Sequence, residues 1–180
     1  MDKIDRLFAT AWQARSDGHY DIAQASLNEA ILISREAGDE IALAKALTAK
    51  GQIERDCGRI GVALPLYEEA VRLYRRASDP LALASALRHL GDLHQDREDY
   101  DDAEPFYDEA LAIYRAVDAT PPLALANALR PIALLREAQG EPPMALPIWR
   151  EALTLYSEVG VQAGVDECRT RIGALAHQAF

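Results

Sequence analysis

Hydrophobic positions along the chain recur at the spacing of an α-helix. Between residues 80 and 97, Leu83, Leu87 and Leu90 fall on one helical face, and His94 continues this stripe. A short polar turn at residues 98–100 separates this segment from a second helical segment at about residues 101–117. Runs of β-branched residues, which are typical of strands, are scarce. The pattern therefore predicts two helices joined by a tight turn.

This helix pair is one of four similar units. Alanines that mark the second helix are spaced 40, 40 and 42 residues apart, and another alanine follows each of them after seven positions. The marker alanines are Ala23, Ala63, Ala103 and Ala145. We therefore expect an all-α solenoid in one domain over residues 1–180. Its helix pairs should lie at about 2–38, 39–78, 79–118 and 119–160, with a ninth, capping helix at about 161–180.

The turn inside each pair has its own signature. Five residues before the marker alanines stand Gly18, Gly58, Glu98 and Gly140. Glycine at this position predicts a left-handed residue that ends the first helix. Pro80, Pro121 and Pro122 mark the starts of later helix pairs, where a missing N–H group costs little.

Residues of the third unit resemble the tetratricopeptide repeat. Leu90-Gly91, Tyr100, Ala103, Tyr107 and Ala110 have the spacing of that motif, and the resemblance covers about residues 2–160. The usual unit has 34 residues, so the longer repeats here look more like those of kinesin light chains and bacterial peptide-sensing regulators. The resemblance implies a right-handed superhelix whose first helices line a concave groove, the usual ligand site of the family.

Twelve residues opposite the apolar stripes are the candidate binding residues of that groove. They are Phe8, Trp12, Arg15, Lys45, Thr48, Gln52, Arg55, Ser85, Arg88, Asp92, Asn127 and Arg130. The faces that contain them, which also include Asp5, Leu134 and Glu137, carry five basic and three acidic residues, whereas the whole chain has a formal net charge of −10. The groove is therefore expected to be less acidic than the rest of the surface.

Arg88 and Arg130 occupy equivalent repeat positions, and this arrangement indicates a site that recognises carboxylates. Arginine pairs bidentately with such groups, so one hypothesis is that the groove takes an acidic or C-terminal peptide segment. The alternative is that the two arginines are solvated and pair with Asp92 and Glu137 of the same chain.

Phe8 and Trp12 stand on a face that is polar in the other repeats. Exposed aromatic residues are typical anchors of interfaces. They could grip an apolar residue of a ligand or a second copy of the chain. The alternative is that the first helix tilts and buries them.

Chemistry of the catalytic or metal-binding kind has little support in the sequence. Phosphate-binding, dinucleotide-binding, zinc-protease and nucleophile-elbow motifs are absent. His89 and His94 are five positions apart and point in different directions on a helix. A calcium loop beginning at Asp96 or Asp99 would lack glycine at its sixth position and a carboxylate at its twelfth. We expect no cofactor, no metal and no enzymatic activity.

The amino-acid composition further limits the classes of partner that we expect. The isoelectric point of about 4.8 disfavours nucleic acid and anionic membranes as partners. Two cysteines without a disulfide framework, together with a charged start that has no secretory signal, favour the cytoplasm. The prediction is a protein- or peptide-binding scaffold. A self-associating module that forms homodimers and, third, an enzyme with an unrecognised site are the alternatives.

Overall fold

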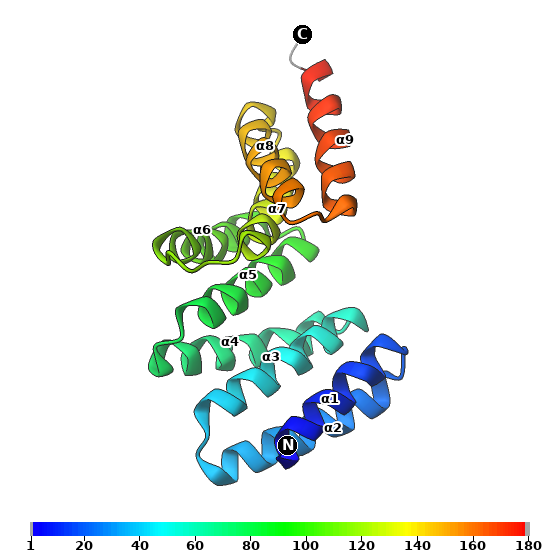
Figure 1. Ribbon diagram of the computed structural model, residues 1–180, viewed down its shortest axis with the longest axis vertical. Helices are drawn as coiled ribbons and strands as arrows, with labels where there is room; N and C mark the ends of the chain where they lie inside the picture. The colour runs from blue at the N-terminus through cyan, green and yellow to red at the C-terminus, as the bar shows by residue number, and fades with distance from the viewer. Residues whose placement is uncertain (1, 179–180) are drawn as a thin grey trace. The chain divides into compact units, whose positions relative to one another are not determined.

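The structure is a computed structural model that describes residues 2–178 (Figure 1). Within this range the chain forms nine α-helices and no strand, so the predicted all-α architecture and number of helices are confirmed there. The helices are α1 (Lys3–Ser16), α2 (Tyr20–Ala37), α3 (Glu40–Asp56), α4 (Ile60–Ala77), α5 (Pro80–Asp96), α6 (Tyr100–Ala116), α7 (Pro122–Ala138), α8 (Pro142–Glu158) and α9 (Gln162–Gln178).

Aspartates begin several of these helices. The carboxylate of Asp2 accepts the backbone N–H of Asp5, and Asp5 accepts that of Asp2 in return, which makes a capping box at the start of α1. Asp39 and Asp79 accept backbone N–H groups three residues later, at the starts of α3 and α5. Each cap satisfies a donor that the first helical turn leaves unpaired.

The turns inside the pairs have the predicted left-handed conformation. Gly18, Gly58 and Gly140 have φ values of 77°, 73° and 75°. Glu98, at the equivalent position, adopts φ 63°. Because a side chain at positive φ is disfavoured, this third turn is held by its surroundings rather than by residue preference.

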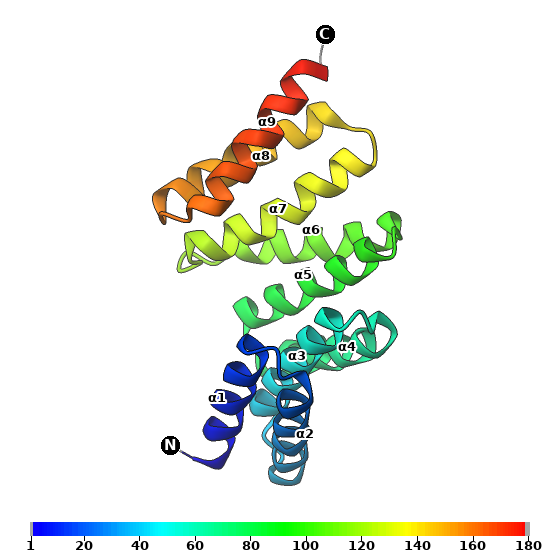
Figure 2. The same ribbon diagram turned by 90° about the vertical axis from the view of Figure 1, so that its right-hand side faces the viewer.

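The helices fall into two compact units, which meet in sequence between Leu93 and His94 within α5. In the first unit, α1, α2 and α3 pack side by side (Figure 2). They enclose a core of small and large apolar side chains. Ala11, Ala14, Ala23, Leu27 and Ile53 form this core. The alanines let the helix axes approach, and Leu27 fills the space beside them.

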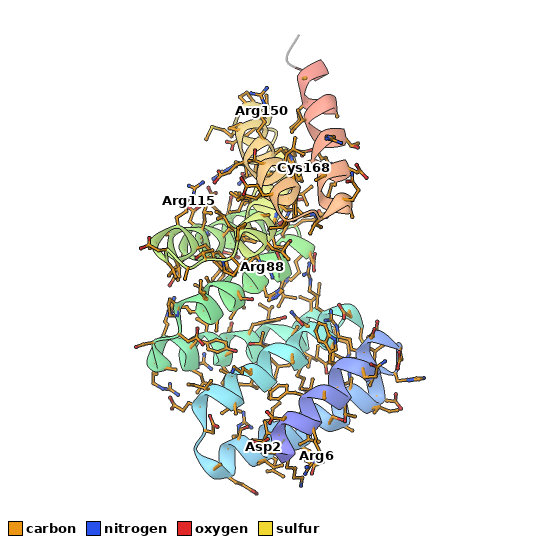
Figure 3. The ribbon with its side chains drawn as sticks, in the orientation of Figure 1. Asp2, Arg6, Arg88, Arg115, Arg150 and Cys168 are labelled. Atoms are coloured by element: carbon orange, nitrogen blue, oxygen red, sulfur yellow. The ribbon has the colours of Figure 1, made fainter. Side chains whose placement is uncertain are left out.

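In the second unit, α7, α8 and α9 share a core around Trp149 and Tyr156. Cys168 of α9 is fully buried in it, and Figure 3 shows this residue on the helix that follows α8. Helix α9 therefore packs on the last helix pair, as expected of a capping helix. Among residues 2–178, none of the helices combines the length and apolar character needed to span a bilayer.

Candidate functional site

An apolar hollow lies between α1 and α3 of the first unit. Trp12 beside it is 69% exposed, and Phe8 is half-buried against the core of this unit. The hollow has a volume of about 340 Å³. Its lining consists of Phe8, Ala9, Ala11, Trp12, Arg15, Leu27, Ala49, Gln52 and Ile53. The first helix thus leaves Trp12 at the surface instead of burying it, and the tryptophan borders a space large enough for an apolar side chain.

Arg15 joins this apolar hollow to a polar network. Its guanidinium carbon lies 5.9 Å from the centroid of the Trp12 ring, within the range of a cation–π contact. Its Nε donates to Asp56 Oδ2 at 2.7 Å, and its Nη1 donates to Gln52 Oε1 at 3.3 Å. The guanidinium therefore holds α1 against α3 and fixes the orientation of the Gln52 amide.

His89 of α5 is the centre of the network. Its Nε2 accepts hydrogen bonds from Gln52 Nε2 at 3.1 Å and from Arg88 Nη2 at 3.0 Å, while Nδ1 lies 3.2 Å from Asp92 Oδ2. Both groups facing Nε2 are donors, so the proton belongs on Nδ1, which donates to Asp92. The imidazole is neutral in this arrangement, and burial lowers its pKa although the Asp92 hydrogen bond opposes that shift.

Asp92 receives three donors in the same network. Arg88 Nη1 lies 2.9 Å and Arg55 Nη1 lies 3.2 Å from its Oδ2, in addition to the His89 contact. Burial alone would raise the pKa of this carboxyl, but the His89 hydrogen bond and the arginine charges together lower it. The residue is 6% exposed. The pattern predicted Asp92 on a solvated face, whereas the structure buries it as an anion with its own donors.

Tyr67 of α4 borders the network and packs against the ring of His89. Its ring centroid lies 5.2 Å from that of His89, and its side chain is fully buried. The hydroxyl has no hydrogen-bond partner among the described residues. Burial, together with the nearby Asp92 charge, raises the pKa of this hydroxyl. Tyr67 was not among the residues that the sequence pattern predicted for this face.

Three other residues of the first unit were also predicted to bind the ligand, namely Lys45, Thr48 and Ser85. Lys45 is exposed, and Ser85 is half-buried on α5. The hydroxyl of Thr48 donates to the backbone carbonyl of Ala44 at 2.9 Å, within its own helix. The structure therefore gathers Trp12, Arg15, Gln52, Arg55, Arg88 and Asp92 into one connected face of α1, α3 and α5. We call these six residues the first-unit face.

Asn127 and Arg130 lie in the second unit, on α7. The guanidinium of Arg130 donates to both carboxylate oxygens of Glu167 on α9, at 2.6 and 2.8 Å. Asn127 Oδ1 accepts the Tyr156 hydroxyl at 2.9 Å. Glu137, the partner expected for Arg130, accepts hydrogen bonds from Trp149 and Arg171. The recognition of a ligand carboxylate by Arg88 and Arg130 stays a prediction.

A separate cluster lies at the turn between α5 and α6. One possible ligand atom from each of His94, Asp99 and Asp102 lies within 4.8 Å of the others. His94 and Asp99 occupy the repeat positions of the ion pairs Glu54–Arg59 at 2.5 Å and Arg136–Glu141 at 3.3 Å. The Asp99 carboxylate also pairs with Arg97 at 3.1 Å. By these equivalences, His94 and Asp99 stand where the other two repeats have an ion pair across the turn.

Comparisons with known proteins agree with this architecture. Residues 42–116 match the family model described as tetratricopeptide repeat. No curated protein sequence matches the chain significantly.

Several crystal structures have the same fold. Aspartyl phosphate phosphatase F from Bacillus subtilis is 15% identical, with a TM-score of 0.85, over 95% of this chain and 45% of that one. BtubC (BKLC) from P. vanneervenii is 16% identical, with a TM-score of 0.75, over 98% and 80% of the two chains.

A third similar structure is a protein from Podosopora anserina, named as a kinesin light chain with nearly identical TPR-like repeats. It is 14% identical, with a TM-score of 0.69, over 99% of both chains. The present chain spans less than half the length of the phosphatase. The predicted resemblance is confirmed: residues 42–116 match the tetratricopeptide-repeat model, and residues 2–178 share the helical-repeat fold of these structures.

Proposed function

We propose that this chain is a binding scaffold that holds a protein or peptide segment on the first-unit face. The observation that supports this most directly is Trp12, which is 69% exposed beside an apolar hollow. Trp12 and Phe8 line this hollow together, so the tryptophan belongs to a continuous apolar surface of the kind that marks interaction sites. Tryptophan and arginine are also enriched among the residues that contribute most of the binding energy at interfaces.

The ligand suited to this face has an apolar group next to an acidic one. The hollow beside Phe8 offers apolar lining, and Arg15 stands at its rim. Arg55 and Arg88 continue the positive side of the face, and their side chains are 32% and 18% exposed. A peptide with a bulky apolar residue beside an aspartate, a glutamate or its own C-terminus would meet both features.

Affinity capture followed by quantitative mass spectrometry tests this function. The wild-type chain should retain a set of proteins that Trp12→Ala loses, because the substitution removes the anchor and leaves the core intact. Leu32→Ala is the matched control, since Leu32 is 56% exposed on another helix, α2. Equal capture by all three chains would exclude the first-unit face as the binding surface.

Self-association is the second candidate function. The same exposed Trp12 on the first helix could seat a second copy of this chain, which buries apolar surface in the same way. Light scattering separates the two functions. A dimer that persists on dilution and disappears in Trp12→Ala favours self-association, whereas a monomer at all concentrations favours a foreign ligand.

A further inference from the structure

The apolar hollow between α1 and α3 has a filled counterpart one repeat later. The first three repeats are spaced 40 residues apart, so Ala49 of α3, which lines the hollow, is equivalent to His89 of α5. His89 is 7% exposed, whereas Ala49 is only half-buried. A methyl group therefore borders the hollow at the position where the next repeat has a buried imidazole ring.

The residue that packs against this imidazole also has a smaller counterpart. In the filled contact between α4 and α5, the ring centroids of Tyr67 and His89 lie 5.2 Å apart. The equivalent of Tyr67 is Leu27, which is fully buried and lines the hollow. Leucine and alanine thus replace two stacked rings. The hollow of about 340 Å³ lies beside both of these smaller residues.

The polar groups that surround His89 are replaced or already occupied at the hollow. Three polar side chains bond to the imidazole in the filled contact. Their equivalents are Trp12, Thr48 and Gln52. Trp12 presents an aromatic ring, the Thr48 hydroxyl donates to a backbone carbonyl of its own helix, and the Gln52 amide already bonds to Arg15 and His89. A polar or charged group in the hollow would therefore lose water without gaining a partner.

We propose that this hollow is a subsite for the phenyl ring of a phenylalanine residue in the bound protein or peptide. The ring takes the place that His89 fills in the next repeat and packs on Leu27, as His89 packs on Tyr67. Contacts with the rings of Phe8 and Trp12, which also line the hollow, favour it over an aliphatic side chain. An apolar cavity of about 150 Å³ is already large enough for benzene. This inference rests on the proposed function, because it names the apolar residue of that ligand.

Nuclear magnetic resonance of the full chain, labelled at its alanine methyl groups, tests the subsite. The probes are the N-acetyl amides of phenylalanine, leucine and histidine, which differ only in their side chains. The Ala49 signal, identified with Ala49→Gly, should shift saturably with the phenylalanine probe, with an affinity roughly threefold higher than for the leucine probe. The histidine probe should bind more weakly than either. An Ala49 signal that no probe shifts, or a leucine probe that binds as tightly as the phenylalanine probe, overturns the subsite.

A variant that copies the next repeat makes the result decisive. Ala49→His places a ring of the chain's own beside Leu27, so it should weaken binding of the phenylalanine probe by about tenfold or more, followed at the Trp12 indole signal. Leu32→His is the matched control, because it adds the same ring on α2, where Leu32 is 56% exposed, and should leave the affinity unchanged. An Ala49→His chain that binds the probe as tightly as the wild type overturns the subsite.

Urea unfolding shows whether a ring fits the hollow, even if Ala49→His does not fold. Ala49→Phe should hold or raise the unfolding midpoint, because the hollow has room for its ring. Ala46→Phe should lower the midpoint, because Ala46 on the same helix is fully buried and the added ring overpacks the core. Equal losses for the two phenylalanine variants would contradict a hollow that accepts a ring.

The proposed function is tested separately. Protein capture that is lost with Trp12→Ala but unaffected by Ala49→His would keep the scaffold function and remove the phenyl subsite. Saturable binding of the phenylalanine probe at Ala49, in a chain whose captured proteins ignore Trp12→Ala, would keep the subsite and remove the scaffold function as we describe it.

Discussion

The ring of Tyr67 lies directly against the backbone of Gly51. A Cβ atom added at Gly51 would come within 2.6 Å of Cε2 and 2.9 Å of Cδ2 of that ring. Tyr67 in turn faces His89 at 5.2 Å, so the tyrosine is held between α3 and α5. This close approach positions the polar network of the first-unit face, because movement of the ring would displace His89 and its partners.

Gly51→Ala should therefore destabilise the fold. The added methyl group meets a ring that has no free space around it, and overpacking of this kind costs roughly 1–3 kcal/mol of unfolding free energy. Gly61→Ala is the control, because a Cβ atom there meets nothing within 4 Å. This second change should stabilise the helix by about 0.5 kcal/mol. Urea unfolding measures both, and equal midpoints for the two variants would contradict the packing described.

Phenylalanine substitutions of two equivalent tyrosines should have opposite effects. Tyr107→Phe breaks the bond to Gln95 and should cost about 1 kcal/mol of unfolding free energy. Tyr67→Phe removes a buried hydroxyl that has no partner, and should leave the stability unchanged or raise it by about 1 kcal/mol. Thermal unfolding of the two variants compares them. A larger loss for Tyr67→Phe than for Tyr107→Phe would mean that the Tyr67 hydroxyl has an acceptor in solution.

Acid should weaken the fold through His89. Burial lowers the pKa of this imidazole below its ordinary value of 6.5, so the unfolded chain takes up a proton at a higher pH than the folded chain does. The free energy of unfolding therefore falls as the pH drops below 6.5, by up to about 1.4 kcal/mol for each pH unit per histidine. The loss ends once the folded imidazole is protonated as well.

A neutral replacement isolates this effect. His89→Gln can accept from Arg88 and donate to Asp92, and its unfolding free energy should change less between pH 6.5 and 5 than that of the wild type. His19→Arg is the control: His19 is exposed, and arginine stands at the equivalent position 59. Identical pH profiles for the wild type and His89→Gln would contradict a neutral, buried His89.

Trp12→Ala should leave the fold intact, because the side chain is 69% exposed. Substitutions at exposed positions usually change the free energy of unfolding by no more than about 0.5 kcal/mol. Chemical unfolding should give the same midpoint as for the wild type, within that range. A loss of several kcal/mol would place Trp12 in the core and remove it as a binding anchor.

The fold could be predicted from the sequence because the same pattern of apolar and turn residues recurs in each repeat. The alanines near position 23 and their counterparts recur in register, and the turn glycines gave the helix ends to within a few residues. The site was less accessible. Asp92 lies on the polar face of its helix in the sequence pattern, and only the packing of α3, α4 and α5 shows that it is buried. It bonds to His89, whose ring packs against Tyr67.

Contacts of this kind depend on side-chain directions in three helices, which begin at Glu40, Ile60 and Pro80. The pattern placed Gln52, Arg55 and Arg88 on one face, but it could not give their partners, since a long side chain can reach several neighbours. One signal was available in the sequence. The residue twelve positions before each large aromatic is Arg55, Gln95 or Glu137, and the change from acceptor to donor marks the second repeat as different.

Selection from a random peptide library tests the central claim most directly. Peptides that the wild-type chain enriches are titrated against the wild type, Trp12→Ala and Leu32→Ala. We predict that the enriched peptides have a bulky apolar residue beside a carboxylate. Their affinity should be at least tenfold lower for Trp12→Ala than for the wild type, and unchanged for Leu32→Ala. A library without enriched sequences, or peptides that bind Trp12→Ala as well as the wild type, would contradict binding at the first-unit face.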